Sequence, residues 1–137
     1  MKRIFILLLS LMLGVSSFAN HWNPNPHQFP TNMNVIAVIE INGIEQTTTS
    51  LELGAFYGDE CRGSQMLNYY ESLDRHMLFL TLYGSYGHIF TFKLYDHETQ
   101  QELDLDCDQT ISFSSDAIIG ALRDPYIFSF TGGSSYT

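Results

Sequence analysis

The chain has 137 residues, of which 45% are hydrophobic and only 15% are charged, and its formal net charge is −9. This length suits one domain, and the composition is too apolar for general disorder and has no collagen-like or low-complexity bias. Six basic residues scattered over an acidic chain exclude a nucleic-acid partner, because phosphate binding needs clustered lysine and arginine.

The first nineteen residues have the pattern of a secretory signal peptide. Lys2 and Arg3 precede an apolar run over residues 4–15, and the small residue Ala19 precedes a cleavage point before Asn20. This run is shorter than the roughly 20 residues that a membrane-spanning helix needs. We therefore expect export to the periplasm, the cell surface or the medium, and a mature chain that does not span a membrane. That chain keeps 4 basic and 15 acidic residues, a net charge of −11.

Residues 20–33 are expected to form an extended lead-in to the domain. The three prolines of this segment forbid a regular helix or a central strand. Trp22 and Phe29 are its large apolar side chains, and we expect them to pack on the domain that follows.

Residues 34–130 have the pattern of short strands separated by turns. Strands are predicted over 35–41, 44–49, 51–57, 62–67, 76–83, 88–95, 101–107, 110–113 and 126–130. Asn42-Gly43 is the strongest hairpin signal, because both residues tolerate a positive φ. Strands at about ten-residue spacing without a sustained helical period predict an all-β fold. We expect a single antiparallel β-sandwich, Ig-like or jelly-roll-like, with about eight or nine strands, followed by a flexible tail over residues 131–137.

Two cysteines, Cys61 and Cys107, predict one disulfide. An exported chain meets an oxidising compartment, where paired cysteines usually form a bridge. The two residues are 46 positions apart, and closing a loop of this length stabilises a fold by about 4 kcal/mol in the chain-entropy model. The alternative is two buried thiols, because a domain of this size can bury a sizeable core without cross-links.

Motifs that would indicate an enzyme are absent from the sequence. The stretch from Gly58 to Ser64 has the glycine spacing of a phosphate-binding loop but lacks the lysine, and its two acidic residues would repel phosphate. There is no Gly-x-Ser-x-Gly elbow, and the five histidines lack the spacing of a zinc site. We therefore expect that the protein is not an enzyme.

An acidic segment, residues 102–108, alternates carboxylates with apolar residues. In a strand these carboxylates would share one face, at a spacing of about 6.6 Å. One interpretation is a solvated outer face. A second is a calcium site, for which Asp104, Asp106 and Asp108 are the candidate ligands, although the segment lacks the glycine and the terminal glutamate of an EF-hand. A third is the carboxylate pair of a glycosidase. No cofactor other than calcium is expected.

Tyrosines next to turns are the candidate ligand-binding residues. Tyr69, Tyr70, Tyr83 and Tyr86 lie beside predicted turns rather than in strand centres. Exposed aromatic rings can stack on sugars or anchor a protein partner. The alternative is that these rings cap the edge of the sandwich, since strands favour aromatic residues.

Residues 53–63, LGAFYGDECRG, resemble the GAFxGDECRG signature of a β-sandwich module found in exported Bacteroidetes proteins. Weaker matches at 32–43, 90–96 and 124–130 extend the likeness over residues 22–130. The resemblance implies an exported, non-enzymatic module with no catalytic residues to transfer. It also implies that the turn is an architectural corner, in which Arg62 pairs with a neighbouring carboxylate. A role of Arg62 in ligand binding is the alternative.

These patterns together predict the function in general terms. We expect an exported, non-enzymatic binding or adhesion-type module that engages a glycan or a protein at the cell envelope. A structural subunit of an envelope assembly is the first alternative, and a carboxylate-based hydrolase is the second.

Overall fold

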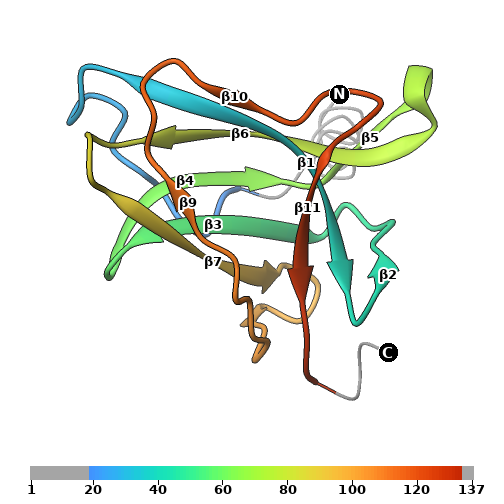
Figure 1. Cartoon of the computed structure of the whole chain (residues 1–137). Coiled ribbons are helices and arrows are strands. Elements are labelled where there is room, and N and C mark those ends of the chain that lie inside the picture. Colours follow the sequence, from blue (N-terminus) through green and yellow to red (C-terminus); the bar gives the residue numbers. More distant parts are fainter. Residues whose placement is uncertain (1–18, 134–137) are drawn as a thin grey trace, which may run out of the picture.

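The computed structural model describes residues 19–133, so all but the last residue of the predicted signal peptide, and residues 134–137 of the predicted tail, lie outside the described part. The described chain is all-β, and two sheets pack face to face as a β-sandwich (Figure 1). This confirms the predicted fold class. Between residues 19 and 133 no helix is long and apolar enough to cross a membrane.

The strands divide between two sheets. Sheet A contains β1 (Asn32–Ile41), β2 (Ile44–Glu45), β5 (Asn68–Tyr70), β6 (Arg75–Tyr83), β10 (Ile118–Ile119) and β11 (Tyr126–Phe130). Sheet B contains β3 (Leu51–Tyr57), β4 (Glu60–Met66), β7 (Ile89–Asp96), β8 (Gln101–Glu102) and β9 (Ile111–Ser112). A short 3-10 helix, η1 (Glu71–Leu73), joins β5 to β6.

Strand β1 is the centre of sheet A. It pairs antiparallel with β6 and β2, whereas β10 and β11 pair with it in parallel. The sandwich is antiparallel as predicted apart from these two pairings, which are parallel. Parallel neighbours need a long crossover connection, and the chain provides one because β1 is its first strand and β11 its last. The long chain between them forms sheet B and the rest of sheet A.

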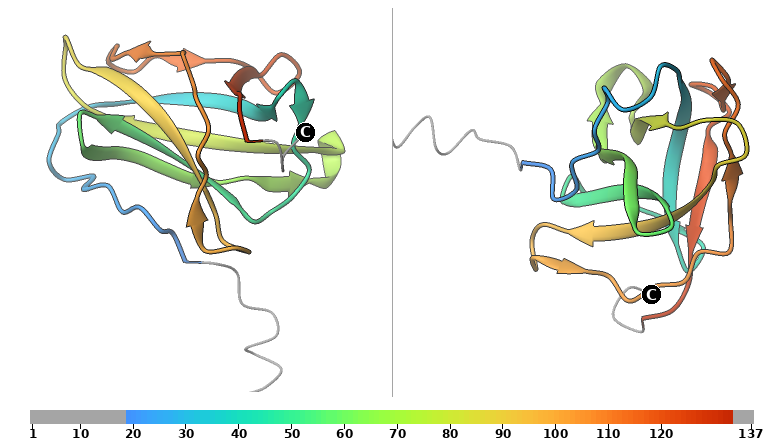
Figure 2. Two further views of the ribbon diagram at one scale, coloured as in Figure 1. Left: turned by 90° about the horizontal axis from the view of Figure 1, so that it is seen from below. Right: turned by 90° about the vertical axis from the view of Figure 1, so that its left-hand side faces the viewer.

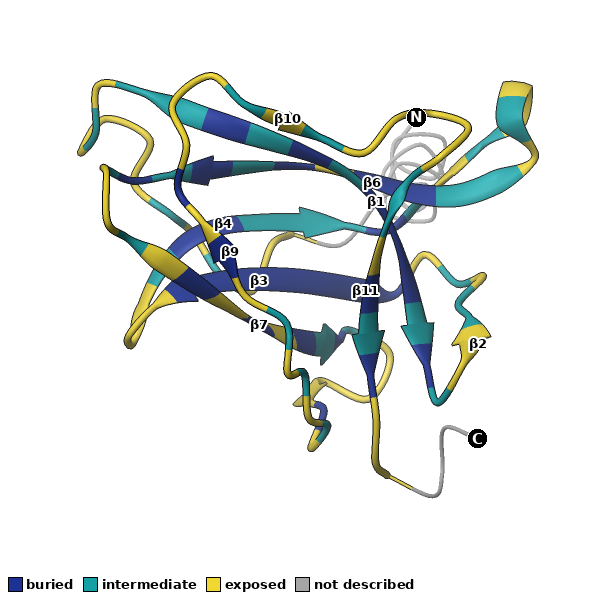
Figure 3. Ribbon diagram, in the orientation of Figure 1, coloured by how far each residue is buried: buried dark blue, intermediate teal, exposed yellow. Residues whose placement is uncertain are grey.

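The core lies between the sheets and is built by alternation along the strands. Inward-facing residues of β1, β3, β6, β7 and β11 form one buried cluster, and residues 67, 103, 111 and 113 complete it. Figure 3 shows this alternation most clearly along β7, where exposed and buried positions follow each other. A period of two places every second side chain on the same face, which is why the pattern of β7 could be predicted.

All nine predicted strands correspond to strands of the structure. The bounds of β3 and β11 are as predicted, and those of the other seven differ. The hairpin at Asn42-Gly43 is confirmed, with positive φ at both residues. The predicted strand 44–49 shrinks to β2, and 101–107 shrinks to β8. Strands β5 and β10 were not predicted. A strand of two or three residues has too few alternating positions to carry a signal, so only its pairing partners define it.

The N-terminal segment, residues 20–31, is called the strap, because it lies along the outer face of sheet B beside β3 and β4 (Figure 2). Trp22 packs against Phe56, with the two ring centroids 5.2 Å apart. A Cβ at Gly54 would lie 2.5 Å from the indole ring, so only glycine leaves room for this contact. The expected packing of Trp22 on the domain is confirmed, and β3 is buried on both faces as a result (Figure 3).

The predicted disulfide is absent. Cys61 and Cys107 are both free. Sheet B has the order β4-β3-β7-β8, so Cys61 on β4 and the segment after β8 lie at opposite edges. Cys107 follows β8 and lies beside Gln109, whose side chain bonds to β11 of sheet A. The two cysteines thus belong to different parts of the sandwich, whereas the Cα atoms of a bridge lie within about 7 Å of each other. The alternative interpretation, two partly buried thiols, is the one that the structure bears out.

Candidate functional site

A cavity of about 390 Å³ lies at the end of the sandwich where β6 connects to β7. Three segments form its walls: the last residue of the strap, the β6–β7 connection and the chain after β9. The lining residues are Thr31, Ser85, Tyr86, Phe113, Ser114 and Ser115. Five of these six side chains carry a hydroxyl group, and none carries a charge. The cavity therefore offers hydrogen bonds and aromatic surface to a neutral ligand.

A tight turn presents the tyrosine of this cavity. The backbone N–H of His88 donates to the carbonyl of Ser85 at 3.0 Å, and Gly87 has a φ of +90°. A positive φ at the third position is the mark of a type II turn, and glycine adopts it without steric cost. Tyr86 occupies the second position, at the tip of the turn, where its side chain is 97% exposed. A ring so exposed is free to stack on a ligand.

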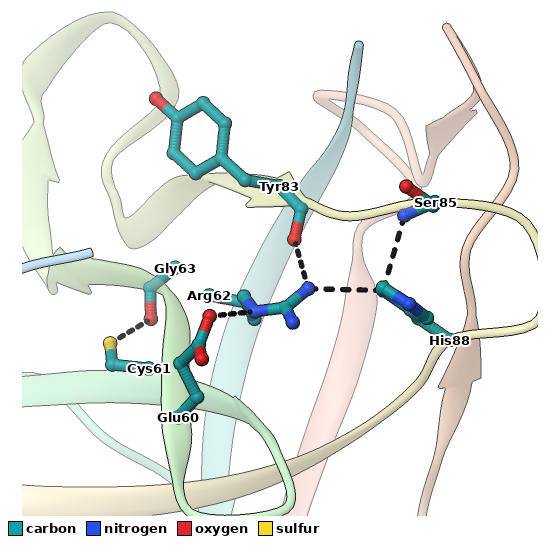
Figure 4. A network of polar contacts seen from close by, with 7 residues as sticks. All are labelled: Glu60, Cys61, Arg62, Gly63, Tyr83, Ser85 and His88. Carbon is teal, nitrogen blue, oxygen red and sulfur yellow. Dashed lines mark hydrogen bonds and ion pairs between the residues drawn. The ribbon is translucent and has the colours of Figure 1, made fainter. Parts of the chain in front are cut away.

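Arg62 contacts this turn through a hydrogen bond to His88 (Figure 4). Its guanidinium donates to the Glu60 carboxylate at 2.7 Å, to the Tyr83 carbonyl at 3.4 Å and to Nδ1 of His88 at 3.0 Å. The Phe29 ring of the strap lies 4.1 Å from Cζ of the same group. The predicted pairing of Arg62 with a neighbouring carboxylate is confirmed. Arg62 is only 6% exposed, so it holds the walls of the cavity together and does not line it.

The four candidate tyrosines do not form one platform. Tyr69 and Tyr70 lie on β5 and pair in register with the beginning of β6, whereas Tyr83 is the last residue of β6 (Figure 1). The Tyr69 hydroxyl donates to Asp74 at 2.7 Å, and the Tyr70 ring packs against Phe79. Of the four, only Tyr86 lines the cavity.

The acidic segment lies on the surface. Asp104, Asp106 and Asp108 are exposed, while Leu105 and Cys107 between them are partly buried. The backbone of Asp106 pairs with Thr131 through hydrogen bonds of 2.8 and 2.9 Å, so the chain stays ordered beyond the predicted end of the domain. Within residues 19–133 no three side chains of histidine, cysteine, aspartate or glutamate converge on a common point that could hold a metal. The exposure of these three carboxylates agrees with the solvated outer face, and the calcium site stays a prediction.

A second, smaller cavity of about 190 Å³ lies at the other end of the sandwich. Leu73, Arg75, Leu122 and Arg123 line it. Arg75 is already engaged, because its Nε and Nη2 donate to the two carboxylate oxygens of Glu45 at 2.9 and 2.7 Å. This bidentate pair lowers the pKa of Glu45. The pair joins β2 to β6 and takes up much of the donor capacity of Arg75.

Sequence reasoning missed the buried carboxylate of Glu52 and the role of His88. Glu52 points from β3 toward the strap and accepts hydrogen bonds there. One signal was present: the outward positions of β3 carry no polar residue besides Glu52, since the next two are Gly54 and Phe56. An outer face of this composition indicates that another segment covers it. His88 had no comparable signal, because a histidine in a turn is common.

Comparison of the chain with protein-family models, curated proteins and solved structures gives no match. The fold and the cavity thus define a small β-sandwich with a ligand-sized, uncharged cavity at one end. Its resemblance to the exported Bacteroidetes module stays a prediction, and any function has to be argued from the geometry of the site.

Proposed function

We propose that the protein is an exported, non-enzymatic binding module whose cavity beside Tyr86 takes a neutral saccharide. The observation that carries this proposal is the combination of hydroxyl-bearing walls with an almost fully exposed tyrosine ring. Ligand cavities typically hold about 300–1,000 Å³, and a volume of about 390 Å³ suits one or two sugar rings. Tyrosine offers an apolar face for stacking and a hydroxyl for hydrogen bonding.

Charge supports a neutral ligand. Among the described residues no lysine or arginine lines the cavity, so an anion would find no counter-charge from them there. The predicted mature chain has a net charge of −11, which would repel anions further. A saccharide needs only hydroxyl partners and an aromatic face, and both are present.

The alternative functions find less support in the structure. A hydrolase of the glycosidase type uses two carboxylates at the scissile bond, but between residues 19 and 133 no carboxylate lines the cavity. A subunit that assembles by strand addition needs an open strand edge. Strand β11 is not open, because the side-chain amide of Gln109 occupies its outer edge.

A glycan array tests the proposal. The protein is produced from residues 1–137 so that export and cleavage can take place, and mass measurement of the product tests cleavage before Asn20. We expect binding to a neutral glycan and a loss of about tenfold or more for Tyr86→Ala. Removing an aromatic ring on which a nucleic-acid base stacks costs about 1–3 kcal/mol, and we expect a similar effect for a sugar ring. Tyr69→Ala removes an exposed tyrosine at the opposite end and should bind like the wild type. Silence across the array, or equal binding by Tyr86→Ala, would contradict the proposal.

A further inference from the structure

His88 lies where the three walls of the cavity meet. Its backbone N–H closes the turn to Ser85, and its carbonyl accepts the N–H of Phe113 at 2.8 Å. Its ring lies edge-on to the ring of Phe29, with the two centroids 5.9 Å apart. Phe29 comes two residues before Thr31, which belongs to the third wall. A change at His88 therefore acts on every segment that lines the cavity.

The imidazole ring is held through one nitrogen atom. Nδ1 receives the backbone N–H of Ser85 at 3.2 Å and the guanidinium N–H of Arg62 at 3.0 Å (Figure 4). An amide N–H and a guanidinium are donors only, so Nδ1 has to be the acceptor of both. The arrangement thus requires a neutral ring with its proton on Nε2.

The charged and titratable groups around the ring come from two strands. Arg62 of β4 lies at Nδ1, and the Tyr57 ring of β3 is stacked on the imidazole at 4.2 Å between centroids. Glu60, at the start of β4, bonds to Nε of Arg62 and not to His88. In the described chain no carboxylate forms an ion pair with His88. Protonation would therefore place a positive charge on the imidazole beside the buried guanidinium of Arg62, and no carboxylate of the described chain would pair with the new charge.

We infer that His88 is a positioning residue that keeps the cavity in shape only while its imidazole is neutral, so that mild acid opens the turn and releases the ligand. The release rests on the proposed function, whereas the opening of the turn does not. Protonation of Nδ1 removes the acceptor for Ser85 and Arg62 and places two cations about 3 Å apart. The turn that carries Tyr86 then separates from the Arg62 support. Among side chains, imidazole is the one that can take up a proton in mildly acidic solution.

Nuclear magnetic resonance of the ¹⁵N-labelled protein tests the opening without any ligand. At about pH 7.5 the ring nitrogens of His88 should show the proton on Nε2. On lowering to about pH 5, the Ser85 and Phe113 amides should lose hydrogen-exchange protection by about tenfold or more, after correction for intrinsic exchange. The amides of Val35 and Leu53, in the core strands, should keep theirs. A proton on Nδ1 at the higher pH, or unchanged protection of Ser85 at the lower pH, would overturn the inference.

Variants separate the charge of the ring from its shape. His88→Asn places an amide oxygen near the position of Nδ1 and cannot be protonated, so Ser85 should stay protected at both pH values. His88→Leu has no acceptor, so its Ser85 amide should exchange rapidly at both. His76→Asn, a histidine beside Tyr69 at the other end, should leave the wild-type pH profile unchanged. If His88→Asn opens in acid as the wild type does, another group is the switch and the inference fails.

The same glycan array, probed at both pH values, separates this inference from the proposed function. We expect wild-type binding to fall by about tenfold or more in acid, in step with Ser85 protection, and His88→Asn binding to stay constant. If the array shows no binding at either pH, the saccharide function is contradicted. The opening of the turn is then tested by the hydrogen-exchange rates alone. Acid-resistant glycan binding by the wild type would contradict the release.

Discussion

Glu52 is a carboxylate that water does not reach, and it fastens the strap to the sandwich. Its side chain accepts the backbone N–H groups of His21 and Trp22 at 2.6 and 2.9 Å, the ring N–H of His97 at 2.7 Å and the hydroxyl of Ser64. Burial by itself raises the pKa of Glu52, but these hydrogen bonds outweigh it, and the pKa lies below its ordinary value of 4.5. The carboxylate is therefore stabilised in its charged form.

The substitution Glu52→Gln should lower the free energy of unfolding by about 2 kcal/mol at neutral pH, because the new amide N–H groups would face donors. Since folding lowers the pKa, the contribution of Glu52 is fully present above pH 4.5 and is lost as the pH falls through the lowered pKa. Urea unfolding at a series of pH values measures both effects. The difference in stability between wild type and variant should close as the solution is acidified below pH 4.5.

Glu71→Gln is the matched control, because Glu71 is an exposed carboxylate in η1. Its unfolding free energy should agree with that of the wild type to within about 0.5 kcal/mol. A Glu52→Gln protein as stable as the control at neutral pH would mean that the carboxylate does not hold the strap.

At the scale of single residues, pairing was predictable where the partner is near in the sequence. Arg62 and Glu60 are two positions apart, and an arginine in an acidic turn has few other partners. Glu52 and His21 are separated by 31 positions. The apolar outer face of β3 indicates that a segment covers it, but the sequence does not tell which segment or which backbone groups reach Glu52. Polar contacts over such distances depend on the packing of the whole fold, which is why this anchor was missed.

At the scale of elements, the outer edge of β11 is closed by a side chain. Gln109 donates from Nε2 to the Ile127 carbonyl at 2.7 Å and accepts the Ser129 N–H on Oε1, also at 2.7 Å. This amide repeats the donor and acceptor pattern that a neighbouring strand would offer. Open strand edges are sites of edge-to-edge association, and proteins commonly cover them. Gln109 covers this edge without an additional strand.

Replacing Gln109 by leucine should make the protein associate with itself. The change leaves one N–H and one carbonyl of β11 without partners, at a cost of roughly 1 kcal/mol each, and the open edge can then pair with another chain. Light scattering over a range of protein concentrations should show a monomeric wild type and a larger, concentration-dependent species for Gln109→Leu. Gln101→Leu, an exposed glutamine on β8, adds the same apolar side chain elsewhere and should stay monomeric. Association of both variants alike would indicate surface hydrophobicity as the cause.

Elements were predictable where alternation or turn chemistry is local. The long strands β1, β3, β6 and β7 carry enough alternating residues to stand out, and the Asn42-Gly43 turn follows from the two residues that form it. Strand β5 exists because the chain leaves β3 after β4 and pairs with β6 of the other sheet. That change of partner is a property of the closed sandwich and has no counterpart in the local sequence.

At the scale of the whole molecule, the sandwich keeps its two thiols apart. Cys61 lies on β4, and Cys107 lies beside Gln109 near β11, with Sγ 3.6 Å from the amide oxygen. Burial raises the pKa of both thiols, which lowers the share of reactive thiolate at neutral pH. The prediction of a bridge followed from compartment and cysteine number alone. Neither the compartment nor the number of cysteines tells how far apart Cys61 and Cys107 lie in the fold, and the prediction of a bridge was wrong.

Alkylation of the unfolded protein without reductant should add two groups per chain, one at each cysteine. The folded protein should react much more slowly at neutral pH, because both thiols are partly buried and protonated. Mass spectrometry with and without prior reduction measures the difference. A chain that takes up alkyl groups only after reduction would contain the bridge that the structure lacks.

The cavity was only partly predictable at this scale. Tyr86 stood out as an aromatic residue in a turn, but Thr31, Phe113 and Ser114 come from distant parts of the chain. Their meeting depends on how the strap, the β6–β7 connection and the chain after β9 close one end of the sandwich. Neither spacing nor composition carries that information.

The docking of Trp22 against Gly54 and Phe56 has a spectroscopic consequence. Trp22 is the single tryptophan of the chain, and it belongs to the strap, whereas the tyrosines between residues 19 and 133 are spread over the sandwich. Tryptophan emission therefore reports on the strap alone, and near-ultraviolet circular dichroism of the tyrosines reports on the sandwich. Detachment of the strap and collapse of the sheets can thus be followed as separate optical signals in the unlabelled protein.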